Sequence, residues 1–444
     1  MKTERIAPTI SDLTRIRDLK GLKDLMHKPK ATMILDHAAN ALELLKFGTL
    51  EYGEVKSFMN AVEDVLFSLK AIRGKSASYT KDEITVDVQD EYYADIDKDG
   101  HITNHKARVR IFCLAFLSES PIIEVGINDK RRRGKEIVGR LDIIPIKTEE
   151  WIRIEDYELH GTIDKEVFEE TKVVKLNPLD AVRYELLRFR VRPRINIELP
   201  LQIRVQMSIV ERHIEVRIEV MVTGYYSNSR RAAQTPCEDI QIRFPIPEDW
   251  VYLFRVEKRF KYGAVHSSKR KAGKIKGLER LLTAFAQGIL PPSLIEVSTG
   301  LAKYEQAFHA VVWRIDQLPE RNEGAYKTHL MVINIDLAPH DKMPEQLDKY
   351  VHVEYAMANS TVSRAQVRSI AISNGADEPA DKWVRHLAKY EYTIEMEFTD
   401  KVKPQSEDIM APLKPVLPAA EEPDSNAPKA APEDGSENSS SDSD

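Results

Sequence analysis

Cysteine is scarce in this 444-residue chain, which has only Cys113 and Cys237, far apart and without Cys-x-x-Cys spacing. This scarcity excludes a disulfide scaffold and a thiolate zinc site, and it fits a reducing compartment. The N-terminal sequence MKTERIAPTISDL lacks the apolar core of a secretory signal. No apolar run approaches the roughly 18 residues of a membrane span. We therefore expect a cytoplasmic protein with no transmembrane segment, able to act at a membrane only peripherally.

Signatures of the common enzyme classes are missing as well. The chain has no GxGxxG, Walker, GxSxG or HExxH motif, and its 12 histidines do not fall at metal-ligand spacing. One segment, DIDKDGHITNHK at 95–106, matches part of a calcium loop but carries Lys106 where a bidentate glutamate should close the ion's shell. Its strand-like flanks favour a hairpin turn. We predict a protein that is not an enzyme and holds no metal or cofactor.

Helical spacing of apolar residues is confined mainly to the first part of the chain. The segment 52–74 carries an apolar stripe, with Gly74 expected to end the helix, and KATMILDHAANALELLKFG is a second amphipathic segment. We expect such stripes to pack into a core, with a partner-binding face as the alternative. The stripe of the first segment consists of Val55, Phe58, Met59, Val62, Val65, Leu66 and Leu69.

Strand-like alternation dominates residues 78–400. Apolar and polar side chains alternate on both sides of a polar turn within 201–222, which predicts an antiparallel hairpin with one buried face. The segment 381–397 also alternates, with Tyr390 on its apolar face and Trp383 and Arg385 on its polar face. We predict an all-β fold of packed sheets, interrupted by one helix at 274–288. Further strands are predicted at ARVRIFCLAF, EDIQIRFPI, HAVVWRIDQL, HLMVINIDL and VHVEYAMA.

Positive charge is concentrated in residues 255–280, where ten Lys or Arg and two Glu give a local net charge of +8. Two interpretations stay open: a solvated loop, or a surface that attracts anionic phospholipids or an acidic partner protein. Nucleic acid is disfavoured, because the densest part of the cluster, 269–276, has no interleaved aromatic residues for base stacking and the whole chain is acidic. A second cluster lies at 131–133. The densest part of the first cluster consists of Lys269, Arg270, Lys271, Lys274 and Lys276.

The C-terminal segment 401–444 has a different composition, with seven prolines and ten acidic residues. It holds too little apolar surface to offset chain entropy, so we expect an acidic, Pro- and Ser-rich disordered tail. Its serines flanked by acids are candidate phosphate acceptors, and a purely solvating tail is the alternative.

Several sequence blocks, in the same order, resemble the mu homology domain of clathrin-adaptor medium subunits and, more closely, the stonins. The resemblance covers about residues 30–400. The medium-subunit blocks are VGINDK (125–130), LNPLDAVRYELLRFR (176–190), GLAKYEQAFHAVVWRI (300–315) and KWVRHLAKYEY (382–392). The stonin-like blocks are EEWIRIEDYELHG (149–161), CEDIQIRFPIPEDW (237–250), GKIKGLERLL (273–282) and LIEVSTGLAKYE (294–305).

The resemblance implies a mu homology domain at 78–400 with two sandwich-like subdomains, the second inserted in the first and both preceded by short α-helices. We expect a helical N-terminal region at 1–77 that is a remnant of the region before the domain. The expected bounds are 78–195 and 348–400 for the first subdomain, 196–347 for the second and 401–444 for the tail.

The resemblance also implies a pocket for tyrosine-based sorting signals. Trp383, Arg385 and Asp87 stand at pocket positions, whereas Thr85 and Leu114 replace an aromatic residue and a lysine of the family. We therefore expect a remnant pocket with weakened or altered binding. The alternative is that Trp383 is covered by a neighbouring strand or loop.

In function, the resemblance implies a non-enzymatic endocytic adaptor. It would bind synaptotagmin and promote its clathrin-mediated retrieval in synaptic vesicle recycling, at the presynaptic membrane and coated pits. The expected cargo site is Tyr304 with the basic residues of 269–276, and Tyr304 as an ordinary half-buried strand residue is the alternative. Further expected partners are a clathrin adaptor complex and anionic phospholipids. The rival function is a medium-chain-like structural subunit of a clathrin adaptor coat complex.

Overall fold

The computed structural model describes residues 46–74, 79–146, 148–194, 197–223, 235–254, 273–274, 294–320, 324–344, 346–373 and 379–399. The amphipathic segment expected before residue 46 and the acidic tail lie outside these residues. So does the helix expected at 274–288, except for its first residue, Lys274, which belongs to a two-residue strand instead.

The described elements are mainly strands. The helices are α3 (Tyr52–Ser68), η1 (Lys130–Arg132), α4 (Lys165–Thr171), η2 (Glu248–Trp250), α5 (Val251–Phe254) and η3 (Gln306–Phe308). The first strands are β1 (Glu83–Ile96), β2 (Ile102–Phe116), β3 (Ile122–Ile127), β4 (Glu155–Leu159), β5 (Val173–Leu176), β6 (Tyr184–Val191), β7 (Leu201–Val210), β8 (His213–Val222) and β9 (Cys237–Pro245). The others are β10 (Gly273–Lys274), β11 (Ile295–Val297), β12 (Leu301–Glu305), β13 (Ala310–Leu318), β14 (Thr328–Asp336), β15 (Tyr350–Ala358), β16 (Val367–Ser373), β17 (Asp381–Glu395) and β18 (Glu397–Thr399).

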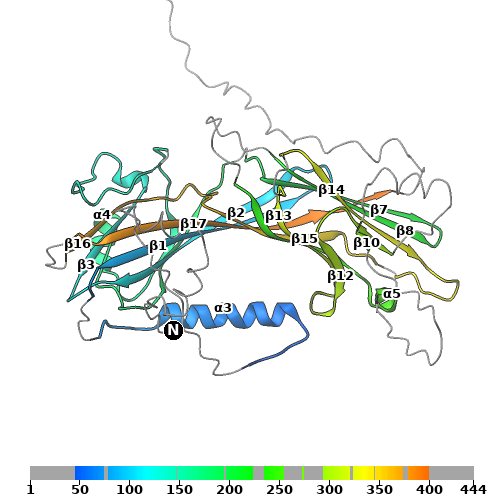
Figure 1. The fold of residues 1–444 in the computed structure, drawn as a ribbon, viewed down its shortest axis with the longest axis horizontal. Helices are drawn as coiled ribbons and strands as arrows, with labels where there is room; N and C mark the ends of the chain where they lie inside the picture. Colours follow the sequence, from blue (N-terminus) through cyan, green and yellow to red (C-terminus); the bar gives the residue numbers. More distant parts are fainter. Residues whose placement is uncertain are drawn as a thin grey trace, which may run out of the picture.

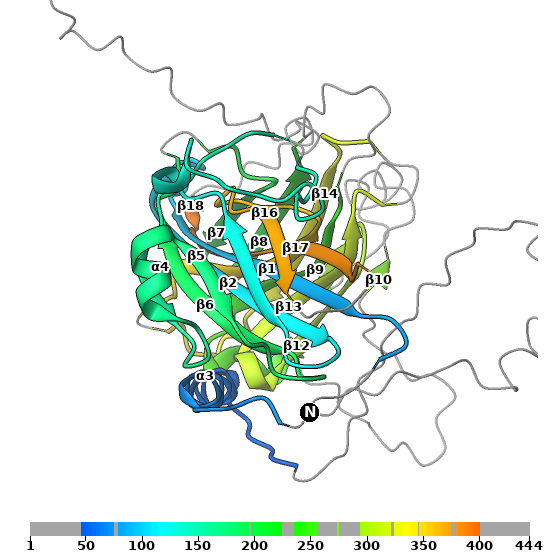
Figure 2. The same cartoon turned by 90° about the vertical axis from the view of Figure 1, so that its left-hand side faces the viewer.

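One long sheet runs through the whole molecule (Figure 1). Its nine strands follow the order β12-β13-β9-β15-β17-β1-β2-β6-β4, so β1 lies between β17, which is parallel to it, and the antiparallel β2. A six-stranded sheet, β10-β11-β14-β8-β7-β18, and a three-stranded sheet, β16-β3-β5, complete the fold. The end view in Figure 2 shows the strands stacked in layers, with α3 at their side.

Two apolar cores lie along the same long sheet. One core contains the last residues of β1 and β17 and joins them to the six-stranded sheet around Trp313. The other contains the first residues of β1 and the last residues of β2, and joins them to the three-stranded sheet around Phe168. The prediction of an all-β fold with two sandwich-like subdomains is confirmed. The residue bounds assigned to the subdomains stay a prediction.

Local sequence signals account for the hairpins. β7 and β8 pair from Leu201↔Val222 to Val210↔His213, as the alternation in 201–222 predicts. Between β1 and β2, the Asp97 carboxylate accepts hydrogen bonds from the backbone N–H groups of Asp99 and His101. The calcium-like segment is therefore a hairpin turn closed by its own aspartate. No cluster of metal-ligating side chains occurs among the described residues.

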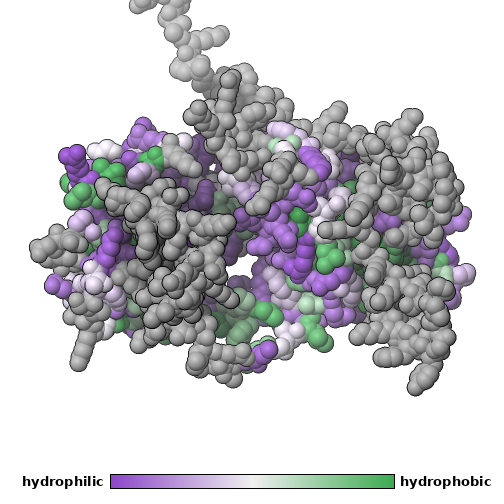
Figure 3. Space-filling view, viewed as in Figure 1, coloured by the Kyte–Doolittle hydropathy of each residue, from purple (hydrophilic) through white to green (hydrophobic). Residues whose placement is uncertain are grey.

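Helix α3 forms where helical spacing predicts it, but two expectations about it are wrong. It ends at Ser68 rather than near Gly74, because Leu69 adopts extended backbone angles. It has no buried residue, and the stripe expected in a core faces solvent, with exposed fractions from 38% for Val55 to 59% for Val65. Apolar surface is visible in Figure 3 at the lower edge of the molecule, where Figure 1 places α3.

The physical reason for this orientation is the charge of the sheet beneath the helix. Lys56 of α3 lies 2.9 Å from the Glu391 carboxylate of β17, and Glu63 lies 2.7 Å from the guanidinium of Arg110 in β2. The half-buried residues Tyr52, Lys56, Glu63 and Phe67 form one helical stripe. The helix therefore presents its polar and aromatic side to a charged sheet face and its apolar side to water. No described helix is long and apolar enough to span a membrane.

Candidate functional site

The candidate pocket residues lie on the outer face of the long sheet, which is the face covered elsewhere by α3. Cross-strand pairing aligns Trp383 of β17 with Thr85 of β1 and Leu114 of β2. Two residues further along, Arg385 is aligned with Asp87 in the same way. Side chains two residues apart on a strand share a face, so the two rows form one surface.

The Asp87 carboxylate is the centre of this surface. Arg385 donates to it from Nε at 2.7 Å and from a terminal nitrogen at 3.1 Å, and Arg183 donates from Nε at 2.9 Å. A carboxylate offers about four lone-pair positions, so roughly one remains for an incoming hydroxyl group. The side chain of Asp87 is only 16% exposed, whereas that of Arg385 is 64% exposed.

The sequence interpretation missed two contributors to this surface. Phe112 is the residue of β2 that pairs with Asp87, and the Arg183 guanidinium lies 4.1 Å from the centre of its ring. Arg183 thus supplies a second cation on this surface, between the Phe112 ring and the Asp87 carboxylate. Only the alignment of β1, β2 and β6 brings these residues together, so no local sequence signal identifies them.

Beside these residues, β17 presents an open edge. Its pairing with β15 ends at Leu387, which is opposite Ala358. None of the described strands pairs with Asp381–Arg385 on that side. A cavity of about 500 Å³ opens there, lined by Asp87, Arg183 and Arg385 among others. Trp383 is 49% exposed, so the alternative in which a strand or loop covers it does not hold.

Tyr304 lies at the other end of the sheet, on the edge strand β12. It is partly buried, with its ring centre 6.2 Å from that of Phe254 and its hydroxyl donating to the Gln306 side chain at 3.3 Å. The next residue, Glu305, accepts two hydrogen bonds from Arg314 of β13, at 3.0 and 2.8 Å. These hydrogen bonds lower the pKa of Glu305. The Tyr304 ring is therefore packed against Phe254 at the surface, and it lies next to the Glu305 carboxylate, which Arg314 holds in place.

The predicted basic cargo residues cannot be placed beside Tyr304. Lys269, Arg270, Lys271 and Lys276 lie outside the described residues, and of Lys274 only the backbone is described.

The second basic cluster, at 131–133, is not a cationic surface. Arg132 is 6% exposed and donates to the Ile127 carbonyl at 2.7 Å, and Arg131 bonds to the Asp129 carboxylate. Two of its three guanidinium groups therefore hold the loop after β3 in place.

Comparison with known proteins gives the same family as the resemblance of the sequence blocks. Residues 70–396 match the family described as the adaptor complexes medium subunit family. The chain is 42% identical to Protein stoned-B of Drosophila melanogaster over 433 residues, which are 96% of this chain and 34% of the relative. It is 34% identical to Stonin-2 of Homo sapiens over 374 residues, which are 83% of this chain and 40% of the relative.

This chain therefore spans well under half the length of these curated relatives. Among solved structures, the yeast delta-COP-I mu-homology domain aligns with a TM-score of 0.39 and 12% identity, over 72% of this chain and 100% of that chain. The family match covers the strands of both cores and the candidate surface on β1 and β17. The chain belongs to the adaptor complexes medium subunit family, in which it is similar to the stonins.

Proposed function

We propose that this chain is a non-enzymatic endocytic sorting adaptor that binds cargo proteins on the outer face and edges of its long sheet. Family membership and the similarity to stonins support an endocytic adaptor. The observation that carries the proposal is the open edge of β17, where the exposed Trp383 ring lies in register beside the Arg385–Asp87 pair. A ring, a cation and a carboxylate at a free strand edge suit recognition of an added peptide strand.

At this edge the ligand is a tyrosine-bearing sorting signal. Its backbone pairs with Asp381–Arg385, its ring packs against Trp383, and its hydroxyl donates to the remaining lone pair of Asp87. Two guanidinium groups already occupy that carboxylate, and Thr85 gives no second stacking wall, so binding is weak. Titration of a tyrosine-signal peptide tests this assignment. Trp383→Ala should weaken binding about tenfold, in line with the loss of one aromatic pair contact. Equal affinity of the variant and the wild-type protein would exclude this edge.

The main cargo is synaptotagmin, bound through Tyr304 and the basic residues 269–276. Tyr304 supplies an anchored aromatic side chain, and the basic residues attract an acidic surface of the cargo, which makes capture sensitive to salt. Combining Tyr304→Ala with Lys→Ala changes at 269, 271 and 274 should reduce capture without unfolding the protein. Capture at the wild-type level would contradict this assignment. Stoichiometric co-purification with large adaptor chains would instead favour a structural coat subunit.

The proposed place of action is the cytoplasmic side of the presynaptic membrane, at clathrin-coated pits, during synaptic vesicle recycling. The basic segment 255–280 would add attraction to anionic phospholipids, at about 1 kcal/mol for each basic residue near the surface. Sedimentation with vesicles of neutral or anionic composition tests this part. Equal binding to both vesicle types would show that the segment does not act on lipids.

A further inference from the structure

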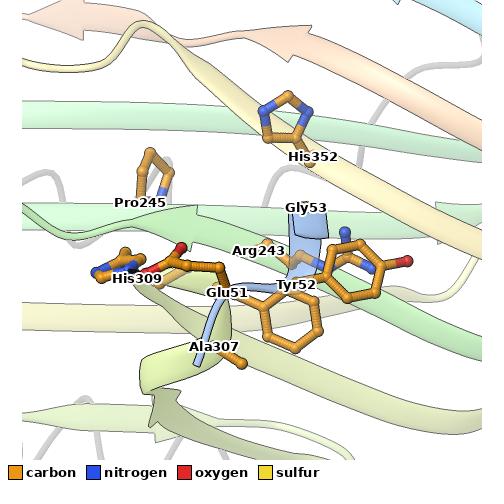
Figure 4. A pocket seen from close by; sticks show the side chains of 10 residues that line it. Glu51, Tyr52, Gly53, Arg243, Pro245, Ala307, His309 and His352 are labelled. Carbon is orange, nitrogen blue, oxygen red and sulfur yellow. Dashed lines mark hydrogen bonds and ion pairs between the residues drawn. The ribbon is translucent and has the colours of Figure 1, made fainter. Parts of the chain in front are cut away.

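The first turn of α3 inserts an aromatic side chain into a site on the outer face of the long sheet. The ring centre of Tyr52 lies 4.6 Å from that of Phe308 in η3, and the Arg243 guanidinium of β9 lies 4.6 Å from the Tyr52 ring centre. The same guanidinium lies 4.4 Å from the Phe308 ring centre. Figure 4 shows Tyr52 beside Arg243, with Glu51 turned toward His309. Two rings and one flat cation therefore form a compact cluster.

Apart from residues 51–53, the side chains that form this site come from the sheet and from η3. Arg243 is 8% exposed and is held by an ion pair of 2.6 Å with Glu354 of the neighbouring strand β15. Its Nε is buried and, within the part of the chain that is described, has no hydrogen-bond partner. A cavity of about 230 Å³ remains beside Tyr52, between Pro245 and His352. The sheet and η3 thus form a cationic and aromatic binding site, here called the Arg243–Phe308 seat, in which some space is left unfilled.

Glu51 and Tyr52, which now occupy this site, are held there mainly by side-chain contacts. The Tyr52 hydroxyl is 3.5 Å from both Glu354 oxygens, at the outer limit of a hydrogen bond, so its ring dominates the contact. Just before it, the Glu51 carboxylate lies 2.8 Å from Nε2 of His309. The rest of α3 adds charged contacts such as the Lys56–Glu391 pair and one aromatic contact, in which the Phe67 ring lies 4.1 Å from the Arg188 guanidinium. Because no side chain of α3 is fully buried, release of the helix would expose only apolar surface that is now partly covered.

We propose that this Arg243–Phe308 seat is a binding site for a partner protein segment that carries an aromatic side chain directly after a carboxylate. Residues 51 and 52 occupy it as a competitor within the same chain. Because α3 is tethered to the domain, its effective concentration at the seat is high, and a partner binds fully only when α3 leaves. The seat is separate from the β17 edge and from Tyr304, so it does not require either of the proposed cargo sites.

The test uses a fluorescent nonapeptide, TLEYGEVKS, which copies residues 49–57, and measures its anisotropy with the full chain. Tyr52→Ala in the chain vacates the seat, so this variant should bind the peptide at least about tenfold more tightly than the wild-type chain. Adding Phe308→Leu to that variant should abolish the gain, with circular dichroism as the check on folding. Adding Arg243→Lys, which keeps the charge but loses the flat face, should reduce the gain as well.

Changes in the peptide separate this seat from the Asp87 pocket. Phe in place of the peptide's tyrosine should keep the affinity within about threefold, because the hydroxyl makes only long contacts, whereas Ala should abolish binding. Asp87→Ala, which alters only the β17 edge, should leave the difference in affinity between the Tyr52→Ala variant and the wild-type chain unchanged. Equal affinity of wild-type chain and Tyr52→Ala, or no binding by the latter, would overturn the proposal and leave Tyr52 as an anchor of α3 only. Loss of the Tyr52→Ala difference on Asp87→Ala would also overturn it.

Discussion

Glu185 of β6 is the buried centre of the charge network beneath α3, and its removal should destabilise the protein strongly. Its carboxylate accepts hydrogen bonds from Arg110 at 3.0 and 2.7 Å and from Arg188 at 3.2 and 3.2 Å. The three side chains are 5–10% exposed. Glu185→Leu leaves two buried guanidinium groups side by side without this carboxylate. The expected loss in the free energy of unfolding is about 3–5 kcal/mol.

The matched control is Glu63→Ala, which removes a second carboxylate from the same Arg110. Glu63 lies 2.7 Å from that guanidinium, but its side chain is 43% exposed and belongs to α3. The expected cost is below about 1 kcal/mol. Urea unfolding followed by tryptophan fluorescence measures both values. A central role of Glu185 would be refuted if Glu185→Leu lowers the free energy of unfolding by less than about 1 kcal/mol, or if the two substitutions lower it equally.

Three further predictions concern α3 and the cysteines. Phe58→Ser combined with Leu66→Ser should change the unfolding free energy by less than about 1 kcal/mol, because both side chains are more than half exposed, and a larger loss in urea unfolding would contradict the solvent-facing stripe. Burial raises the pKa of Cys113 and of Cys237 to about 12, so neither should react with a thiol reagent at pH 8, and reaction of the folded protein would show that the site opens. A hydrogen bond from an arginine of β6 lowers the pKa of Asp64 from 3.8, so this residue favours docking of α3 above that pH and loses the effect as the pH falls below it. The hydrogen-exchange protection of α3, measured relative to the intrinsic exchange rate at each pH, should therefore fall below about pH 4 in the wild-type protein, and less so in Asp64→Asn.

Patterns along the chain predict which side chains of one element share a face. The alternation in 381–397 separates Trp383 and Arg385 from the buried Tyr390 and Tyr392, and the structure has the same division. It does not predict that Arg385 lies opposite Asp87, because parallel pairing joins segments 298 residues apart. That pairing followed only from resemblance to a family.

Patterns of apolar and charged residues along the chain also do not reveal which part of the fold a helix or loop packs against. The apolar stripe of α3 predicts a helix correctly, yet the charged sheet beneath it selects the opposite side of the helix for contact. In the same way, three adjacent arginines at 131–133 suggest a cationic surface. Arg132 is instead buried, and its guanidinium donates to the Ile127 carbonyl and faces the Glu136 carboxylate. Both differences arise from tertiary partners that are distant in sequence or hidden in a loop.

The most direct test of the account is hydrogen exchange of the full chain with and without the cytoplasmic part of synaptotagmin. If this protein works by presenting fixed surfaces of one long sheet to other proteins, exchange at β12, around Tyr304, should become slower when cargo is bound. Exchange in the two cores should then stay unchanged. Cargo binding with no protection at β12, and with protection confined to β7, β8 and β14 or to the three-stranded sheet, would contradict this mode of action.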